Sequence, residues 1–146
     1  MAGLALALDL DRVLADTRPL WDAWLEDAAR RARVELDVPE DREEAAAVLD
    51  EALGDWRPLL ARFAADRAPL WIRPRPDTNA ALRRLAGAGA RIGVFSDAPR
   101  ELVEIALAHA GAARHVEIAG TLAEVQAALG VEAVVVRSRE ELAGLR

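Results

Sequence analysis

Two aspartates, at positions 9 and 11, have the types and spacing most suited to chemistry in this chain. They end a short apolar run, so that the order reads Leu8-Asp9-Leu10-Asp11. Carboxylates that leave a strand two residues apart can turn toward one pocket, where two like charges need a cation or a proton between them. Mg²⁺ takes oxygen ligands, and an aspartate beside it can attack phosphorus while a second one protonates the leaving oxygen. On spacing alone, an ordinary pair of turn residues is an equally open interpretation.

The segments that would position this pair are predicted strands alternating with helices. Helical patterns of about ten residues that end at glycine lie between short apolar runs, which is typical of right-handed βαβ units and a parallel sheet. Ligands of such sheets bind beyond the carboxyl ends of the strands. The expected strands are Leu4–Leu10, Arg91–Phe95, Val116–Ala119 and Ala133–Val136, and the expected helices are Thr78–Leu85, Arg100–Ala110 and Leu122–Leu129.

Residues 17–71 interrupt the alternation with a helical insertion. Three helices are expected there, over Arg18–Leu36, Glu40–Leu53 and Trp56–Trp71. All four tryptophans of the chain fall in this segment, and we expect them to form the core of a small helical bundle.

Composition narrows the classes of function. The chain has 146 residues, which suits one compact domain with an insertion, and its formal charge of −6 argues against binding nucleic acid through phosphate contacts. It has no cysteine, so thiolate chemistry is excluded, and its 19 basic residues are all arginine. The N-terminal apolar run is too short to cross a bilayer, and a soluble cytoplasmic protein without a membrane partner is the default expectation.

The order Asp9-Leu10-Asp11 followed by Val13-Leu14 resembles the first motif of the haloacid dehalogenase (HAD) superfamily. The helical insertion looks like that superfamily's C1 cap. The stretch from residue 73 to residue 97, with a Pro-rich approach, a helix, a glycine and a strand ending in Ser96, resembles the passage into its second motif. The resemblance implies a three-layer, doubly wound α/β fold with a core of residues 1–16 and 72–146 and a cap of residues 17–71.

The resemblance also implies site residues and a reaction. Asp9 matches the nucleophile that forms an aspartyl-phosphate, Asp11 matches the general acid/base, and both would contribute to binding Mg²⁺. Ser96 matches the hydroxyl that binds the transferring phosphoryl group. Because dehalogenases of this superfamily lack the second aspartate, the pair indicates a phosphatase that acts on a small phosphorylated metabolite. Nothing in the sequence names that metabolite.

Later motifs of the superfamily are incomplete here. Arg12 replaces the glycine after the second aspartate, and no lysine is present to neutralise the phosphate. Arg100 and Arg114 are the candidates for that cation, and we favour Arg100 because it begins the helix after Ser96.

The metal-binding carboxylate of the fourth motif is also missing. One register places Ser138 at that position, preceded by Arg137, and the other places Gly120 there with Glu124 nearby. Neither register restores the carboxylate, so metal affinity should fall. Asp97 is expected to cap the helix that begins near Pro99.

Two alternative functions remain. A HAD-like domain with impaired catalysis could bind a phosphometabolite or a protein partner, with an exposed apolar patch buried in a homodimer or another complex. An unrelated flavodoxin-like signalling domain also carries clustered aspartates, but the helical insertion after the first strand speaks against it.

Overall fold

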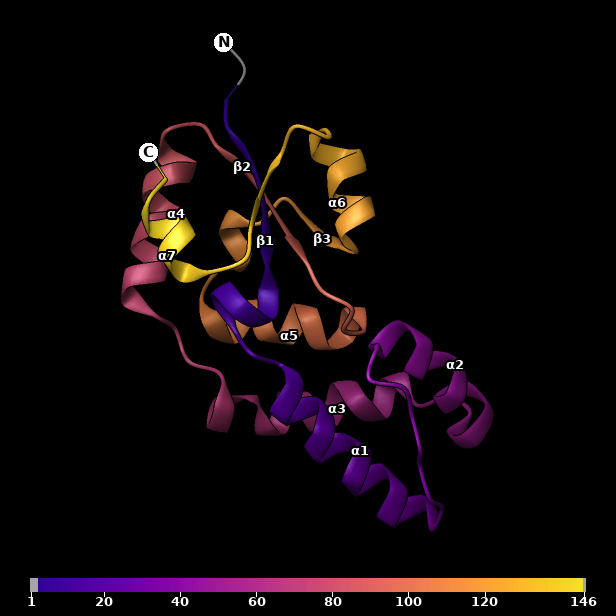
Figure 1. The fold of residues 1–146 in the computed structure, drawn as a ribbon. Helices are drawn as coiled ribbons and strands as arrows, with labels where there is room; N and C mark the ends of the chain where they lie inside the picture. The colour runs from indigo at the N-terminus through magenta and orange to yellow at the C-terminus, as the bar shows by residue number, and fades with distance from the viewer. Residues whose placement is uncertain (1–2, 146) are drawn as a thin grey trace.

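The computed structural model describes residues 3–145, in which four parallel strands form one sheet. The order of the strands across the sheet is β3-β2-β1-β4 (Figure 1). Their bounds are β1 Ala5–Asp9, β2 Arg91–Phe95, β3 Ile118–Gly120 and β4 Val134–Val136. Each predicted strand is therefore present, with ends shifted by up to two residues. Residues 1, 2 and 146 of the predicted core lie outside the described residues.

Helices cover both faces of the sheet, which confirms the three-layer α/β class. One face packs against α4 (Pro76–Gly87), α5 (Arg100–Ala110) and α7 (Arg139–Ala143) through the larger hydrophobic cluster. The other face packs against α6 (Leu122–Leu129), on the opposite side of the sheet in Figure 1. The sequence did not predict α7, which is only five residues long.

The register of the central strand brings chemistry-bearing residues to one edge. β1 pairs with β2 as far as Asp9 opposite Phe95, and it pairs with β4 as far as Leu8 opposite Val136. Because all the strands are parallel, the residues that follow β1, β2 and β4 leave the sheet at the same edge.

Directly after β1 the chain forms a single turn of π-helix, η1, over Leu10–Leu14. Leu10, Val13 and Leu14 are buried in the larger cluster, whereas Asp11 is only half-buried. The burial of these three apolar side chains turns Asp11 toward the helical insertion. Isolated π turns of this kind are frequent at functional sites.

The helical insertion contains α1 (Arg18–Ala32), α2 (Arg42–Leu53) and α3 (Arg57–Trp71), which in Figure 1 lie beyond the carboxyl ends of the strands. The helix α1 ends earlier than expected because Arg33 takes a left-handed conformation with φ of 57°.

Three of the four tryptophans form the core of this insertion, as expected. The ring centroids of Trp21, Trp24 and Trp56 lie 5.5 to 6.2 Å apart, and all three side chains are buried. The indole of Trp56 also donates a 2.7 Å hydrogen bond to Asp50. Trp71 departs from the prediction, since it is 44% exposed at the end of α3.

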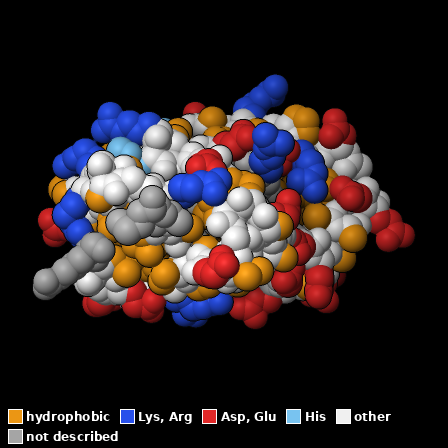
Figure 2. All heavy atoms as spheres, turned by 90° about the horizontal axis from the view of Figure 1, so that it is seen from above, with side chains coloured by type: hydrophobic (Ala, Val, Ile, Leu, Met, Phe, Trp, Pro, Cys, Tyr) orange, Lys and Arg blue, Asp and Glu red, His pale blue; other side chains and the backbone are white. Residues whose placement is uncertain are grey.

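The surface carries charges of both signs. Seen from the side of the amino ends of the strands, arginines and acidic residues are interspersed over the same face (Figure 2). Among residues 3–145 no helix is long and apolar enough to cross a membrane.

Gly93 in β2 allows α6 to approach the sheet, and its substitution tests this packing. A Cβ on Gly93 would lie 2.6 Å from Val125 and 2.9 Å from Leu129, both on α6. We expect Gly93→Ala to lower the free energy of unfolding by about 1–3 kcal/mol, because a packed interior resists added volume. Urea denaturation measures the change. The control is Gly87→Ala, where a Cβ meets nothing within 4 Å; an equal loss in both variants would contradict the packing argument.

Candidate active site

The carboxylate of Asp11 is the acceptor at the centre of a polar network. It accepts hydrogen bonds from the backbone N–H of Thr17 at 2.8 Å, from the hydroxyl of Thr17 at 2.5 Å and from the hydroxyl of Ser96 at 3.0 Å. The guanidinium of Arg42 donates to it at 2.8 Å. The oxygens of this carboxylate are therefore engaged by donors of the same chain.

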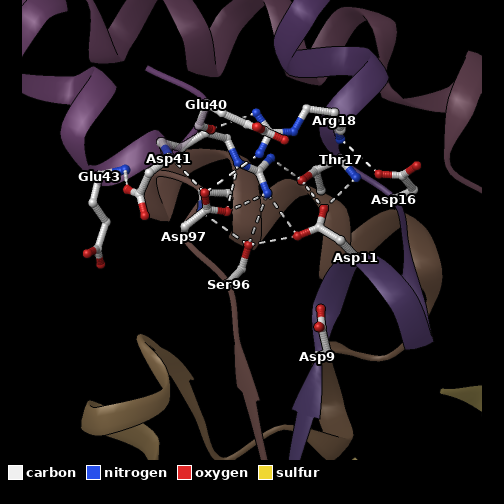
Figure 3. A network of polar contacts seen from close by, with 12 residues as sticks. Asp9, Asp11, Asp16, Thr17, Arg18, Glu40, Asp41, Glu43, Ser96 and Asp97 are labelled. Atoms are coloured by element: carbon white, nitrogen blue, oxygen red, sulfur yellow. Dashed lines mark hydrogen bonds and ion pairs between the residues drawn. The ribbon is translucent and has the colours of Figure 1, made fainter. Parts of the chain in front are cut away.

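Arg42 is the cation of this network, and it comes from the helical insertion. It is the first residue of α2, its side chain is only 2% exposed, and its Nη1 donates to the hydroxyl of Thr17 at 2.6 Å. Its Nη2 also lies 3.4 Å from the hydroxyl of Ser96. In Figure 3 the labelled side chains of Asp11, Ser96 and Asp97 face one another between the helical insertion above and the sheet edge below. An arginine of the same chain therefore lies at the centre of the site that we expected to hold a free cation.

Asp97 is turned toward Arg42 and does not cap α5, so that prediction is wrong. Pro99 is the residue before α5 and no side chain caps it, whereas Asp97 accepts from the backbone N–H of Arg42 at 2.9 Å and from its Nε at 3.0 Å. Arg18 adds a second cation at 3.7 Å. Burial by itself would raise the pKa of Asp97, but the hydrogen bonds and charges of the two arginines outweigh burial and hold the pKa below its ordinary value.

Asp9 stands outside this network. No dashed contact joins it to the other side chains in Figure 3, and its nearest cation is Nε of Arg12 at 4.0 Å. Its side chain is 16% exposed, and burial, with a smaller contribution from the charge of Asp11, raises its pKa despite the N–H and charge of Arg12. Asp9 is therefore an available carboxylate at the carboxyl end of β1.

Arg137 lies beside Asp9, and sequence reasoning gave it no role. It follows the last residue of β4, so continuing the β1–β4 register by one residue places it next to Asp9. Its guanidinium lies 5.3 Å from the ring centroid of Phe95, which pairs with Asp9 on the other side of β1. The guanidinium therefore extends across the end of β1. Its charge lowers the pKa of Asp9, although less than burial raises it.

The predicted phosphate-binding residues are only partly brought to this place. Ser96 joins the network of Asp11, and it shares with Arg100 the lining of a cavity of about 480 Å³. That cavity also presents Glu43, Glu104 and Glu124, and Arg100 is exposed and paired with Glu104 at 2.9 Å. The lining carries more acidic than basic side chains, so it does not suit a phosphate.

Arg114, the other candidate cation, is far from the site in the topology. It lies in the short helix η2 (Ala113–His115), which precedes β3 and so stands at the amino ends of the strands. Ser138 and Glu124, the side chains considered for the missing metal ligand, are engaged elsewhere. Ser138 caps α7 by accepting from Glu141 N–H, and Glu124 forms a capping box with Thr121 at the start of α6.

The donor atoms of the site do not fit Mg²⁺. Asp9 offers a free carboxylate, but the carboxylate of Asp11 is satisfied by its donors and a buried guanidinium balances its charge. Within residues 3–145 no group of three or more His, Asp or Glu side chains is placed to hold a metal ion. A small dication that needs near-octahedral oxygen ligands therefore has one carboxylate here and a cation as its neighbour.

Comparison with known proteins identifies the fold. No protein-family model matches the sequence, and no curated protein matches it. Among solved structures, L-2-haloacid dehalogenase from Xanthobacter autotrophicus, with chloropropionic acid covalently bound, superposes with a TM-score of 0.52 at 18% identity. The match covers 92% of this chain and 68% of that one. The chain therefore shares the α/β fold of that dehalogenase, the fold class that the order of its strands and helices predicted.

Sequence reasoning missed Arg42, although the chain contained a sign of it. Arg42 lies in the acidic run Glu40-Asp41-Arg42-Glu43-Glu44, at the start of the helix expected over Glu40–Leu53. The first turn of that helix forms with Asp41 accepting from the N–H groups of Glu43 and Glu44. A cation in the first turn opposes the helix dipole, and such a local conflict marks a position held by tertiary contacts.

The opposite pKa shifts of Asp9 and Asp97 predict opposite effects of neutralising them. Since the pKa of Asp9 is raised on folding, its charge disfavours the folded state above that pKa, and the penalty disappears as the pH falls to the ordinary value of 3.8. Asp9→Asn should therefore raise the melting temperature at neutral pH, with no gain below that value.

Neutralising Asp97 should have the opposite effect on stability. Its pKa is lowered, so its stabilisation is complete above 3.8 and is lost as the pH falls through the folded-state pKa. Asp97→Asn should cost about 1–3 kcal/mol at neutral pH, because it weakens the pairing of the buried Arg42. Melting temperatures of both variants across the acidic and neutral range give the test, and shifts of the same sign at neutral pH would contradict it.

Proposed function

We propose that this protein is a HAD-type hydrolase that uses the carboxylate of Asp9 as its nucleophile on a small phosphorylated metabolite. The single observation that carries the proposal is the position of Asp9: it lies at the carboxyl end of the central strand, outside the ion-pair network, with Arg12 and Arg137 as neighbouring cations. This edge of a parallel sheet is where ligands bind. A nucleophile needs such freedom, and an anionic substrate needs such cations.

The proposed reaction has two steps. An oxygen of Asp9 attacks phosphorus and the bond to the leaving alcohol breaks, which leaves an aspartyl-phosphate; water then cleaves that intermediate and releases inorganic phosphate. Arg12 and Arg137 would hold the charge of the phosphoryl oxygens. Because the carboxylate of Asp11 already accepts four hydrogen bonds, no general acid is assigned to the reaction, and substrates with good leaving groups should react best. No step is assigned to magnesium, since the donor set does not fit it.

The first test is turnover of an aryl phosphate, such as p-nitrophenyl phosphate, by the full chain. Asp9→Asn should reduce the rate at least about a thousandfold, because an amide cannot form the intermediate. Asp22→Asn, an exposed carboxylate on α1, removes the same charge and should leave the rate unchanged. Residual turnover in Asp9→Asn at the wild-type level would exclude Asp9 as the nucleophile.

A second test compares Arg137, which lies beside Asp9, with Arg100, the phosphate-binding arginine that the sequence favoured. Arg137→Met should lower kcat/KM by about tenfold or more, because it removes a guanidinium from beside Asp9. Arg100→Met removes a cation that is 87% exposed and paired with Glu104, and it should change kcat/KM little. Steady-state kinetics of the two variants side by side decide between them; a larger loss in Arg100→Met would return the role to Arg100.

The impaired HAD-like domain remains the second candidate, and the buried ion-pair network favours it. The guanidinium of Arg42 lies between the carboxylates of Asp11 and Asp97, and residues 3–145 contain no group of three or more His, Asp or Glu side chains placed to hold a metal ion. Such a domain would bind a phosphometabolite or a protein partner without turning anything over. If this second candidate is correct, folded wild-type protein at high concentration should release no phosphate from the aryl phosphate, and neither should Asp9→Asn.

A further inference from the structure

We propose that the guanidinium of Arg42 is the resident cation of this site and takes the place of a free divalent ion. The inference concerns the binding of cations near Asp11 and Asp97, and it holds whether or not Asp9 is catalytic. Only its corollary, that turnover needs no added metal, rests on the proposed function.

The first argument is the geometry around one nitrogen. Nη2 of Arg42 lies 2.8 Å from a carboxylate oxygen of Asp11, 2.8 Å from a carboxylate oxygen of Asp97 and 3.4 Å from the hydroxyl of Ser96. These oxygens come from the segments that follow β1 and β2 at the carboxyl edge of the sheet. Oxygens that converge from separate segments on one positive centre are the arrangement that hard cations require.

The second argument is that Arg42 is held in place. The backbone N–H, Nε, Nη1 and Nη2 of Arg42 all donate to side chains of the site, and its side chain is 2% exposed. Moving this guanidinium out would leave the carboxylate of Asp11 without a cation and that of Asp97 with Arg18 alone at 3.7 Å, which is unfavourable. Arg42 therefore behaves as part of the site, unlike a surface arginine that folds in from solvent.

The third argument is the balance of charge. Asp11 and Asp97 contribute two negative charges, and Arg42 with Arg18 contributes two positive ones. A dication approaching this set meets a neutral group whose lone pairs already accept hydrogen bonds. Its electrostatic attraction to the site is then too weak to offset the free-energy cost of removing water from Mg²⁺ on binding.

Removal of the tethered cation should open the site to a free one. Arg42→Ala leaves Asp11, Asp97 and Ser96 around an empty space, and we expect this variant to bind Mg²⁺ in about the millimolar range and to be stabilised by it. Isothermal titration with MgCl₂ and the Mg²⁺-dependent shift in melting temperature are the two readouts. The wild type and Arg30→Gln, an exposed arginine on α1, should show neither response.

Two further variants make the result specific. In the double variant Arg42→Ala/Asp11→Asn the gained Mg²⁺ binding should weaken by about tenfold or more, because one of its two carboxylates is neutral. Arg42→Lys keeps a cation at the site and should bind no Mg²⁺. Low concentrations of guanidinium ion should compete with Mg²⁺ for Arg42→Ala, since the ion restores the lost group.

Two outcomes would overturn the proposal. One is Mg²⁺ binding by the wild type that disappears in Asp11→Asn, which would mean that a free cation and Arg42 share the site. The other is a folded Arg42→Ala that gains no Mg²⁺ binding. If Arg42→Ala does not fold, the wild type and Arg42→Lys decide: Mg²⁺ binding by either, dependent on Asp11, contradicts the proposal.

Discussion

The ion pairs between the buried guanidinium of Arg42 and the carboxylates of Asp11 and Asp97 are the contacts on which the arrangement of the site depends. They join the first turn of α2 to the loops that follow β1 and β2, and so connect the helical insertion to the sheet edge. Charges taken out of water are tolerated only when every donor and acceptor is paired. Here all three guanidinium nitrogens donate hydrogen bonds, and the insertion is held over the carboxyl ends of the strands.

This constraint places Asp9 and Asp11 in two different environments. Asp11 leaves the strand through the π turn and becomes the acceptor of the network, whereas Asp9 stays on the strand, half-buried and beside Arg12 and Arg137. A pair that looks symmetrical in sequence therefore has unequal chemistry. The carboxylate of Asp11 is engaged by four hydrogen bonds, whereas that of Asp9 takes no part in the network.

Arginine supplies all the basic groups of the chain, and the site reflects this. A guanidinium offers several donors in a fixed plane, so Arg42 can satisfy two carboxylates and a hydroxyl at the same time. An ammonium of lysine could balance the charge but could not make the same set of directed contacts. This is the physical reason that one arginine, contributed by the helical insertion, is able to bind the loops after both β1 and β2.

The sequence by itself determined the fold class, the elements and the edge at which the site lies. Apolar runs, glycine stops and the helical stripe of the insertion are local signals, and they placed β2, α5 and α6 at their observed bounds. Which charged side chains meet was decided only by the tertiary structure. Arg42 is 31 residues from Asp11 and 55 from Asp97, and no local pattern fixes a pairing over such separations. The same holds for Arg137, whose place beside Asp9 depends on β4 pairing with β1 across the whole chain.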